Sequence, residues 1–351
     1  MRRILLILVL FCRPCSLGAQ RVEGRVVIQG AGTGAVGSLV FLGSGQDWTQ
    51  STVTAGDGGF ALTALRPGTY RLRIQRVGAN NFDSEPFTLA AGEVRRETVV
   101  VPPAAVTLEG IRVEAAPRCV ARSAGGDALA QVWEEARKAL FQMAYAAASE
   151  EWEYEYVTYE RDLDREGREV IQDSTRSHWI RGGIPFASAP ADSLARYGYV
   201  RASQPSVTFF APDAEVLLSQ SFLDSHCFRL REGRGREQGM IGLAFDPVRG
   251  RELPDVSGVL WLDRASAEVR HLDFGYTRVR VSDPEALGGR VEYVRLPNGA
   301  WIVQQWHLRW PTMAPIRFGR TPADLRFGPH LRFREVGGSV IQVRRSMNNE
   351  Q

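Results

Sequence analysis

The feature that most constrains the fold is a succession of short β-patterned runs between residues 20 and 102. Turn residues separate these runs about every eight to twelve positions, a spacing typical of β-sandwiches. Within Gly68–Arg76, for example, Leu72 and Ile74 alternate with polar side chains, so one face of the strand turns toward a core. The pattern predicts seven strands: Val22–Ile28, Ser38–Leu42, Gln50–Thr54, Phe60–Thr63, Gly68–Arg76, Glu85–Leu89 and Val94–Val101.

A second module is predicted over residues 127–345, after a linker over 103–126 that contains prolines and glycines. Asp127 is a plausible N-cap for a helix over Ala128–Ser149. An apolar stripe runs along this helix at helical spacing, and charged residues occupy the opposite side. The stripe is Leu129, Val132, Trp133, Ala136, Leu140, Met143, Ala144 and Ala147, and the charged residues are Glu134, Glu135, Arg137 and Lys138. We therefore expect a long helix that covers one face of a sheet.

The rest of this module reads as short helices and antiparallel hairpins. The helices are predicted over Ala191–Tyr197 and Asp213–Asp224. Asn298-Gly299 marks a tight turn between two of the strands. The predicted hairpins are Gly258–Asp263 with Glu268–Thr277, and Arg290–Leu296 with Ala300–Trp310, and in the last strand Ile302, Trp306, Leu308 and Trp310 are expected to share one side. The predicted fold class is thus mainly β: a seven-stranded β-sandwich over 20–102 and an α+β module with a long helix against an antiparallel sheet.

Residues 1–19 have the pattern of a secretory signal peptide. Arg2 and Arg3 precede an unbroken apolar run over Ile4–Phe11, and small residues then lead to a polar restart. The run is too short to span a bilayer, which needs about 20 residues. We expect an exported protein, in a periplasm or associated with an outer membrane, and no transmembrane segment after cleavage. A retained anchor is the alternative.

Charge argues against a nucleic-acid partner. Three of the 43 basic residues lie in the first 19 positions, which leaves 40 basic residues against 40 acidic ones. A balanced surface gives no electrostatic attraction to phosphates.

Two cysteines, Cys119 and Cys227, remain once the signal segment is set aside. In an oxidising compartment such a pair predicts a disulfide bond. Free thiols and a metal site are the alternatives.

A search for catalytic residues gives a negative result. His178, His226, His271, His307 and His330 are scattered, and none has a partner at the spacing of zinc hydrolases. The alternating glutamates at 151, 153 and 155 read as the solvated side of a strand. We therefore expect no enzyme, no cofactor and no metal, although an active site assembled from distant residues would escape such a search.

Three segments of the first module carry a resemblance to a known family. Val22–Val26, Thr54–Phe60 and Leu65–Tyr70 resemble the carboxypeptidase regulatory-like domain. The resemblance implies a prealbumin-like β-sandwich with a carbohydrate-binding-like fold and no catalytic activity. Trp48 and Phe82 would then either stack on a sugar or simply pack, and packing is the favoured interpretation.

The same family opens many TonB-dependent receptors, and Leu108–Ala115 resembles the short segment that precedes their plug. The residues that follow are too few for a plug and a 22-stranded barrel. An intact receptor is therefore excluded, and an accessory role in such a transport system stays open.

The second module resembles the half-barrel carriers that sort lipoproteins to the outer membrane, through Leu260–Asp263 and Leu272–Phe274. The resemblance implies a curved sheet that shelters an acyl chain over helices. Four aromatic residues could then line a cavity, but a filled core is the favoured interpretation. These residues are Trp261, Phe274, Tyr293 and Trp306.

The sequence thus predicts a non-enzymatic, exported cell-envelope protein. Its regulatory-like domain would accompany a module that binds an envelope glycan, a lipid or a protein partner. One alternative is a periplasmic carrier of lipid or lipoprotein acyl chains. Another is an accessory of a TonB-dependent outer-membrane transport system.

Overall fold

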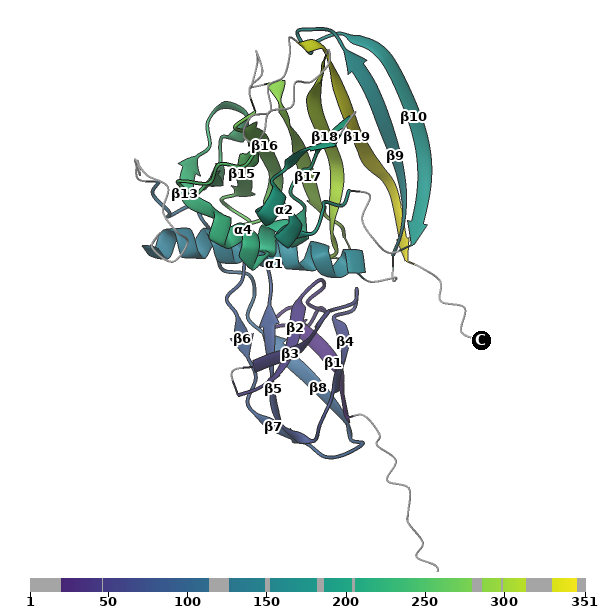
Figure 1. Cartoon of the computed structure of the whole chain (residues 1–351). Coiled ribbons are helices and arrows are strands. Elements are labelled where there is room, and N and C mark those ends of the chain that lie inside the picture. The colour runs from purple at the N-terminus through teal and green to yellow at the C-terminus, as the bar shows by residue number, and fades with distance from the viewer. Residues whose placement is uncertain are drawn as a thin grey trace, which may run out of the picture.

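The computed structural model describes residues 20–45, 47–113, 126–148, 152–181, 186–203, 206–279, 286–297, 299–313 and 330–345. The predicted signal segment and Cys119 lie outside these residues. Within them the chain forms two β-rich bodies, and the long helix α1 (Gly126–Ala148) lies between the two (Figure 1). The predicted mainly-β fold class is confirmed.

The first body is a sandwich of two sheets. In one sheet the central strand β1 pairs antiparallel with β4 and parallel with β8, and in the other the order is β3-β2-β5-β6, with β7 also paired to β5. The strands are β1 (Gln20–Ile28), β2 (Leu39–Ser44), β3 (Asp47–Val53), β4 (Gly59–Ala64), β5 (Gly68–Gln75), β6 (Phe82–Asp83), β7 (Phe87–Leu89) and β8 (Val94–Val101). Each of the seven predicted runs contains a strand. Strand β6 was missed because two residues show no alternation.

The second body is built on a nine-stranded antiparallel sheet among the described residues, in the order β10-β9-β19-β18-β17-β16-β15-β14-β13. The strands are β9 (Trp152–Leu163), β10 (Val170–Arg181), β13 (His226–Glu232), β14 (Met240–Pro247), β15 (Asp255–Asp263), β16 (Val269–Thr277), β17 (Gly288–Arg295), β18 (Trp301–Met313) and β19 (His330–Arg345). Strand β19 lies between β9 and β18 and joins the hairpin β9–β10 to the meander β13–β18. Strands β10 and β13 are the two edges.

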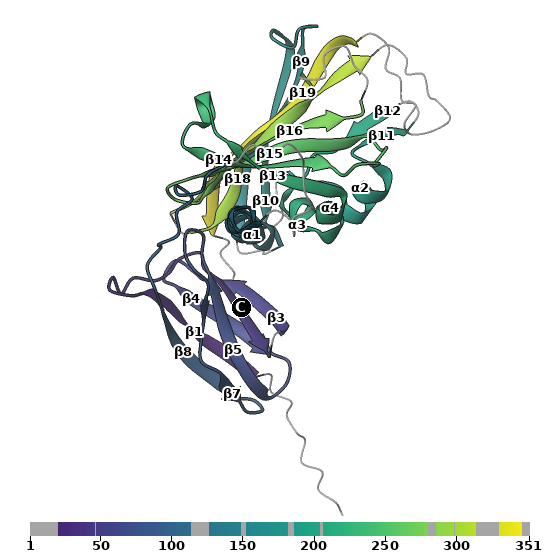
Figure 2. The same ribbon diagram turned by 90° about the vertical axis from the view of Figure 1, so that its left-hand side faces the viewer.

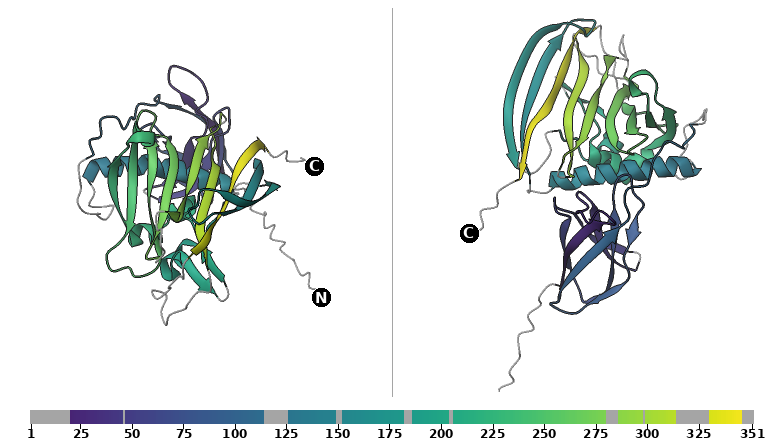
Figure 3. Two further views of the ribbon diagram at one scale, coloured as in Figure 1. Left: turned by 90° about the horizontal axis from the view of Figure 1, so that it is seen from above. Right: turned by 180° about the vertical axis from the view of Figure 1, so that it is seen from behind.

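The sheet curves around its helices, which fill its concave side (Figures 2 and 3). Helix α1 crosses the strands, and a segment between β10 and β13 adds the other elements: α2 (Ala191–Tyr197), β11 (Val200–Ser203), β12 (Ser206–Phe209), α3 (Ala214–Leu218) and α4 (Gln220–Ser225). The single helix predicted over Asp213–Asp224 is two helices, because Ser219 has an extended backbone that ends α3. Its hydroxyl then accepts a hydrogen bond from the Phe222 amide and caps α4.

A β-bulge in β18 changes which side chains face the core. Val291 pairs with Trp306, but Tyr293 pairs with Val303, so one residue of β18 is extra. The bulge places Trp301 and Val303 on the face of Trp306. The one-residue insertion puts Ile302 out of phase with Trp306, against the expectation that the two alternate on one side, although Ile302 still borders the space between α1 and the sheet.

Helix α1 is buried on two sides. It begins at Gly126, with Asp127 in its first turn, slightly earlier than predicted. Its apolar stripe packs in the core of the second body, as expected. Glu135 and Lys138 were expected on the polar side of the helix, opposite the stripe. Both are buried, with 3% and 1% of their surfaces exposed. The first body covers them, because its residues Gly78 and Ala79 hydrogen-bond to both side chains. Among the described residues, no helix is both long and apolar enough to cross a bilayer.

An ion pair inside this interface joins the helix to the sandwich. The Lys138 ammonium lies 2.7 Å from the Glu135 carboxylate and donates a second hydrogen bond, also of 2.7 Å, to the Ala79 carbonyl. The other oxygen of Glu135 accepts a 2.8 Å hydrogen bond from the Gly78 amide. Burial raises the pKa of Glu135 above its usual value, against the opposing effect of Lys138. Each charge therefore depends on its partner, since an unpaired buried charge is costly.

Further contacts surround this pair. Phe41 packs on Phe141 with ring centroids 5.5 Å apart, and the Thr52 and Tyr145 hydroxyls lie 3.0 Å apart. Leu108, which follows the last strand of the sandwich, is completely buried in the second core. Part of the predicted linker therefore packs on the second body, and the two bodies are fixed to each other.

The buried pair yields a prediction about stability. We expect Glu135→Ala to lower the free energy of unfolding by about 3–5 kcal/mol, because Lys138 would stay buried without a counter-charge. Urea denaturation would measure the loss. Glu134→Ala is the matched control, because Glu134 pairs with Arg137 at a partly exposed site and should cost at most about 1 kcal/mol. Equal losses in the two variants would contradict this account.

A second prediction uses the composition of the chain. Lys138 is the only lysine in the sequence, so an amine-directed N-hydroxysuccinimide ester can modify only Lys138 and the terminal amine. We expect Lys138 to react about a hundredfold more slowly in the folded protein than in urea, if opening of the interface costs about 3 kcal/mol. Peptide mass spectrometry would measure the two rates, with the terminal amine as internal reference. Equal rates for Lys138 in both conditions would show that the two bodies separate freely.

Candidate functional site

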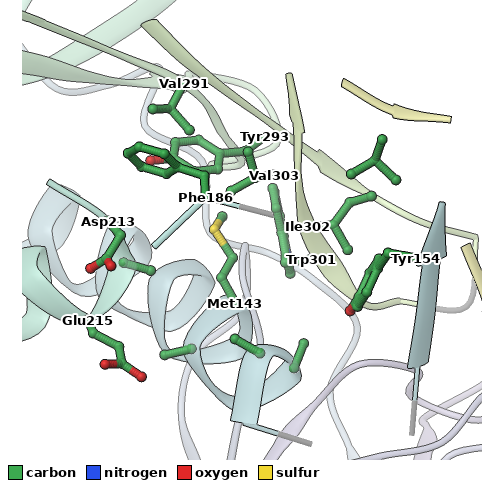
Figure 4. A pocket seen from close by; sticks show the side chains of 15 residues that line it. Met143, Tyr154, Phe186, Asp213, Glu215, Val291, Tyr293, Trp301, Ile302 and Val303 are labelled. Atoms are coloured by element: carbon green, nitrogen blue, oxygen red, sulfur yellow. The ribbon is translucent and has the colours of Figure 1, made fainter. Parts of the chain in front are cut away.

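A mostly apolar cavity lies between the C-terminal half of α1, the start of α3 and the concave face of the sheet (Figure 4). Side chains from β9, β17, β18 and β19 form its sheet side. Its lining consists of Met143, Ala144, Ala146, Ala147, Tyr154, Phe186, Asp213, Ala214, Glu215, Val291, Tyr293, Trp301, Ile302, Val303 and Val340. The acidic residues Asp213 and Glu215 come from the α3 side.

The sequence creates this space with small residues on one side and large ones on the other. Three alanines of α1 and one of α3 leave room between the helices and the sheet. Tyr154, Tyr293 and Trp301 close the opposite side, and the bulge in β18 orients Trp301 toward the helices. Met143 projects into the space between them (Figure 4).

The cavity is narrow. It encloses about 540 Å³ of empty space, its mouth included, yet the centre of a water molecule can move through only about 30 Å³ of it. Pockets for small organic ligands usually have volumes of about 300–1,000 Å³. An extended ligand therefore needs side chains to move. Met143 is suited to this because an unbranched thioether side chain adopts many conformations.

The phenol groups in the lining are neutral at physiological pH. Burial raises the pKa of Tyr154 to about 12. Burial and the nearby carboxylate of Asp213 also raise the pKa of Tyr293 above its ordinary value. Asp213 itself accepts hydrogen bonds from the Val216 and Ser188 amides, at 2.9 and 2.6 Å. Its charge therefore caps α3 and holds a neighbouring loop.

Two polar atoms of the lining are buried without a hydrogen-bond partner among the described residues: Tyr293 Oη and Trp301 Nε1. Each can donate a hydrogen bond. Leaving a buried donor unsatisfied costs about 1–3 kcal/mol. The lining thus holds unused hydrogen-bonding capacity inside an apolar surface.

The structure separates the four aromatic residues predicted to line a cavity. Phe274, Tyr293 and Trp306 belong to the concave core, but only Tyr293 lines the cavity itself. Trp306 packs nearby on Phe186, with ring centroids 6.3 Å apart. Trp261 lies on the opposite face of the sheet with Ala244 and Val259. Its place among the predicted lining residues was wrong, because its neighbours Leu260 and Leu262 take the core side of β15.

Tyr293 apart, sequence reasoning missed the lining residues of this cavity. They come from strands and helices far apart in the chain, so no local spacing relates them. The alanines of α1 gave the only signal, as small residues in an apolar helix stripe, and they were interpreted as contacts with the sheet.

The two aromatic residues considered for sugar stacking, Trp48 and Phe82, both contact other side chains of the first body. The guanidinium of Arg73 lies 4.4 Å from the centre of the Trp48 ring, and Phe82 packs on the sandwich core. These contacts agree with packing, the favoured interpretation. The glutamates of β9 also pair: Glu153 accepts hydrogen bonds from Arg181 and Arg344, which lower its pKa.

His226 and Cys227 occupy the start of β13. His226 is buried and lies 3.2 Å from Asp255, which also pairs with Arg251. Arg251 donates to carbonyls at the end of α2, so this enclosed group fastens α2 and α4 to the sheet. Cys119 lies outside the described residues, and its disulfide bond with Cys227 therefore stays a prediction.

Comparisons with known proteins bear mainly on the first body. No curated protein matches this chain. Among solved structures, a domain from Vibrio parahaemolyticus named for outer membrane lipoprotein sorting has a TM-score of 0.30 and 12% identity, over 63% of this chain and 93% of that chain. A DUF3823 family protein from Bacteroides uniformis has a TM-score of 0.19 and 10% identity, over 69% of this chain and 90% of that chain. At these TM-scores neither likeness carries an argument.

A family model, in contrast, matches residues 21–102, which span the eight strands of the sandwich. This part of the chain is a carboxypeptidase regulatory-like domain.

Proposed function

We propose that this protein is an exported, non-enzymatic protein of the cell envelope whose second body binds an apolar ligand in the cavity beneath α1. The observation that carries the proposal is the apolar lining that surrounds two unused donors. Export is proposed from the signal-like pattern of residues 1–19. The regulatory-like domain would serve as a non-catalytic partner fixed to the back of the helix.

The lining favours an acyl chain over a polar ligand. Alanine, valine and methionine side chains offer no hydrogen bonds, and the phenols stay uncharged. Burial of an apolar chain contributes about 25 cal/mol for each Å² removed from water. This gain would have to exceed the cost of displacing Met143 and its neighbours from their present packing.

The polar groups of the lining favour a neutral head group. Tyr293 Oη and Trp301 Nε1 can each donate to a carbonyl oxygen. A free carboxylate would be repelled by the nearby charge of Asp213, which already acts on Tyr293. An acyl ester, as in a lipid or an acylated lipoprotein, meets both conditions, whereas a fatty acid anion does not.

Mass spectrometry tests whether such a ligand is present in the cell. We expect protein purified from an envelope fraction to carry an esterified acyl lipid in near-stoichiometric amount. Organic extracts of the protein would be compared with extracts of the full-length Ala147→Phe variant, in which a ring fills the cavity. Lipid at the same trace level in both extracts would contradict the proposal.

Filling the cavity should abolish binding. We expect Ala147→Phe to weaken binding of a fluorescent monoacylglycerol at least tenfold, because the ring would occupy space between α1 and the sheet. Ala130→Phe is the control, because Ala130 is exposed on the same helix. Fluorescence titration would measure both affinities, and circular dichroism would verify the folds. Equal affinities in the two variants would place the ligand elsewhere.

The same assays address catalysis. We expect the purified protein to leave peptide, ester and glycoside substrates unchanged, including the bound monoacylglycerol. Sustained turnover that disappears in Ala147→Phe would mean that the cavity is an active site.

A further inference from the structure

The convex face of the sheet, opposite the cavity, carries a cluster of three potential metal ligands. His271 and Asp273 lie two residues apart on β16, and both point away from the core residues Leu272 and Phe274. Glu237 reaches them from a short 3-10 helix, η2 (Gly235–Glu237), in the loop between β13 and β14. No metal was expected from local spacing, because Glu237 is far from His271 along the chain.

The spacing of the ligand atoms matches that of a coordination shell. His271 Nε2 lies 3.4 Å from Asp273 Oδ2 and 3.8 Å from Glu237 Oε1. All three atoms lie within 4.8 Å of one another. Ligands that bind Zn²⁺ tetrahedrally at 2.0–2.1 Å are separated by about 3.4 Å. A cation could therefore contact all three with small movements of the side chains.

The imidazole supplies an independent reason to expect a ligand. His271 is 92% buried, because only 8% of its surface is exposed. Its Nε2 meets no strict hydrogen-bond geometry among the described residues, but it lies within ion-pair distance of both carboxylates. This nitrogen faces the two carboxylates. A neutral imidazole can present a lone pair there, and bound metal would satisfy it.

The charges around the cluster favour a cation. Asp273 and Glu237 contribute two negative charges, and Glu292 stands opposite His271 in the strand register. Arg290 partly balances them. It donates to Asp273 at 2.6 and 3.0 Å and to Glu237 at 3.4 Å. Arg290 thus acts as an outer-shell partner that orients both carboxylates, and a bound cation would share Asp273 Oδ2 and Glu237 Oε1 with it.

We propose that Glu237, His271 and Asp273 form a site for a divalent transition-metal ion, with Zn²⁺ as the representative cation. One imidazole and two carboxylates suit Zn²⁺ better than Mg²⁺ or Ca²⁺, which prefer oxygen ligands alone. The ion would tie the η2 loop to β16. The site lies on the opposite face of the sheet from the cavity and is independent of the acyl ligand.

The test uses the full chain after treatment with a chelator. We expect isothermal titration with ZnCl₂ to give one site per chain, and Zn²⁺ to raise the melting temperature where equimolar MgCl₂ has no effect. His271→Gln should weaken Zn²⁺ binding at least tenfold. Glu237→Gln should also weaken it, and this variant keeps the Asp273–Arg290 ion pair that a substitution of Asp273 would break.

His178→Gln is the matched control, since His178 lies on the edge strand β10, away from the cluster. It should bind Zn²⁺ as tightly as the unaltered chain. Co²⁺ offers a readout of geometry, because its visible spectrum reports tetrahedral coordination, and this spectrum should be lost in His271→Gln. No binding at 100 μM Zn²⁺, or the same affinity in folded His271→Gln and Glu237→Gln, would overturn the proposal.

Discussion

The buried pair of Glu135 and Lys138 determines how this molecule is assembled. Two charges removed from water are tolerated only when each satisfies the other and their remaining hydrogen bonds are made. Here those hydrogen bonds come from the backbone of residues 78 and 79, on the sandwich side. The buried charges of the helix therefore depend on the regulatory-like domain for their remaining hydrogen bonds. A surface that would be solvated in an isolated second body becomes the centre of an interface.

This dependence explains one limit of sequence reasoning. Local alternation and turn residues were sufficient to predict the seven main strands of the sandwich and the hairpins around β15–β18. Glu135 and Lys138, in contrast, are typical of a solvated helix side, and nothing in their immediate sequence indicates a covering domain. The bulge in β18 was invisible for a similar reason. Its single extra residue is defined by pairing with β17, so the residues on each face became clear only from the register.

The candidate sites show the same distinction between local and distant information. Aromatic residues of β16–β18 were correctly associated with a hydrophobic core. The cavity itself, however, depends on alanines of α1 that lie opposite them. Glu237 joins His271 and Asp273 only because the chain turns back between β13 and β14. The two faces of one sheet thus differ in character. Neutral phenols and aliphatic groups occupy the concave face, while carboxylates, an arginine and a histidine gather on the convex face.

The position of β19 has a consequence for the order of folding. It is the last strand in chain order, yet it lies in the interior of the sheet and pairs with β9 and β18. Until this strand emerges, the hairpin β9–β10 and the meander β13–β18 have no common hydrogen-bonded neighbour. Its pairings join residues far apart in sequence, which makes the final step slow by topology. The second body therefore cannot close its sheet before β19 has been synthesised, and a chain without β19 would leave the facing edges of β9 and β18 unpaired.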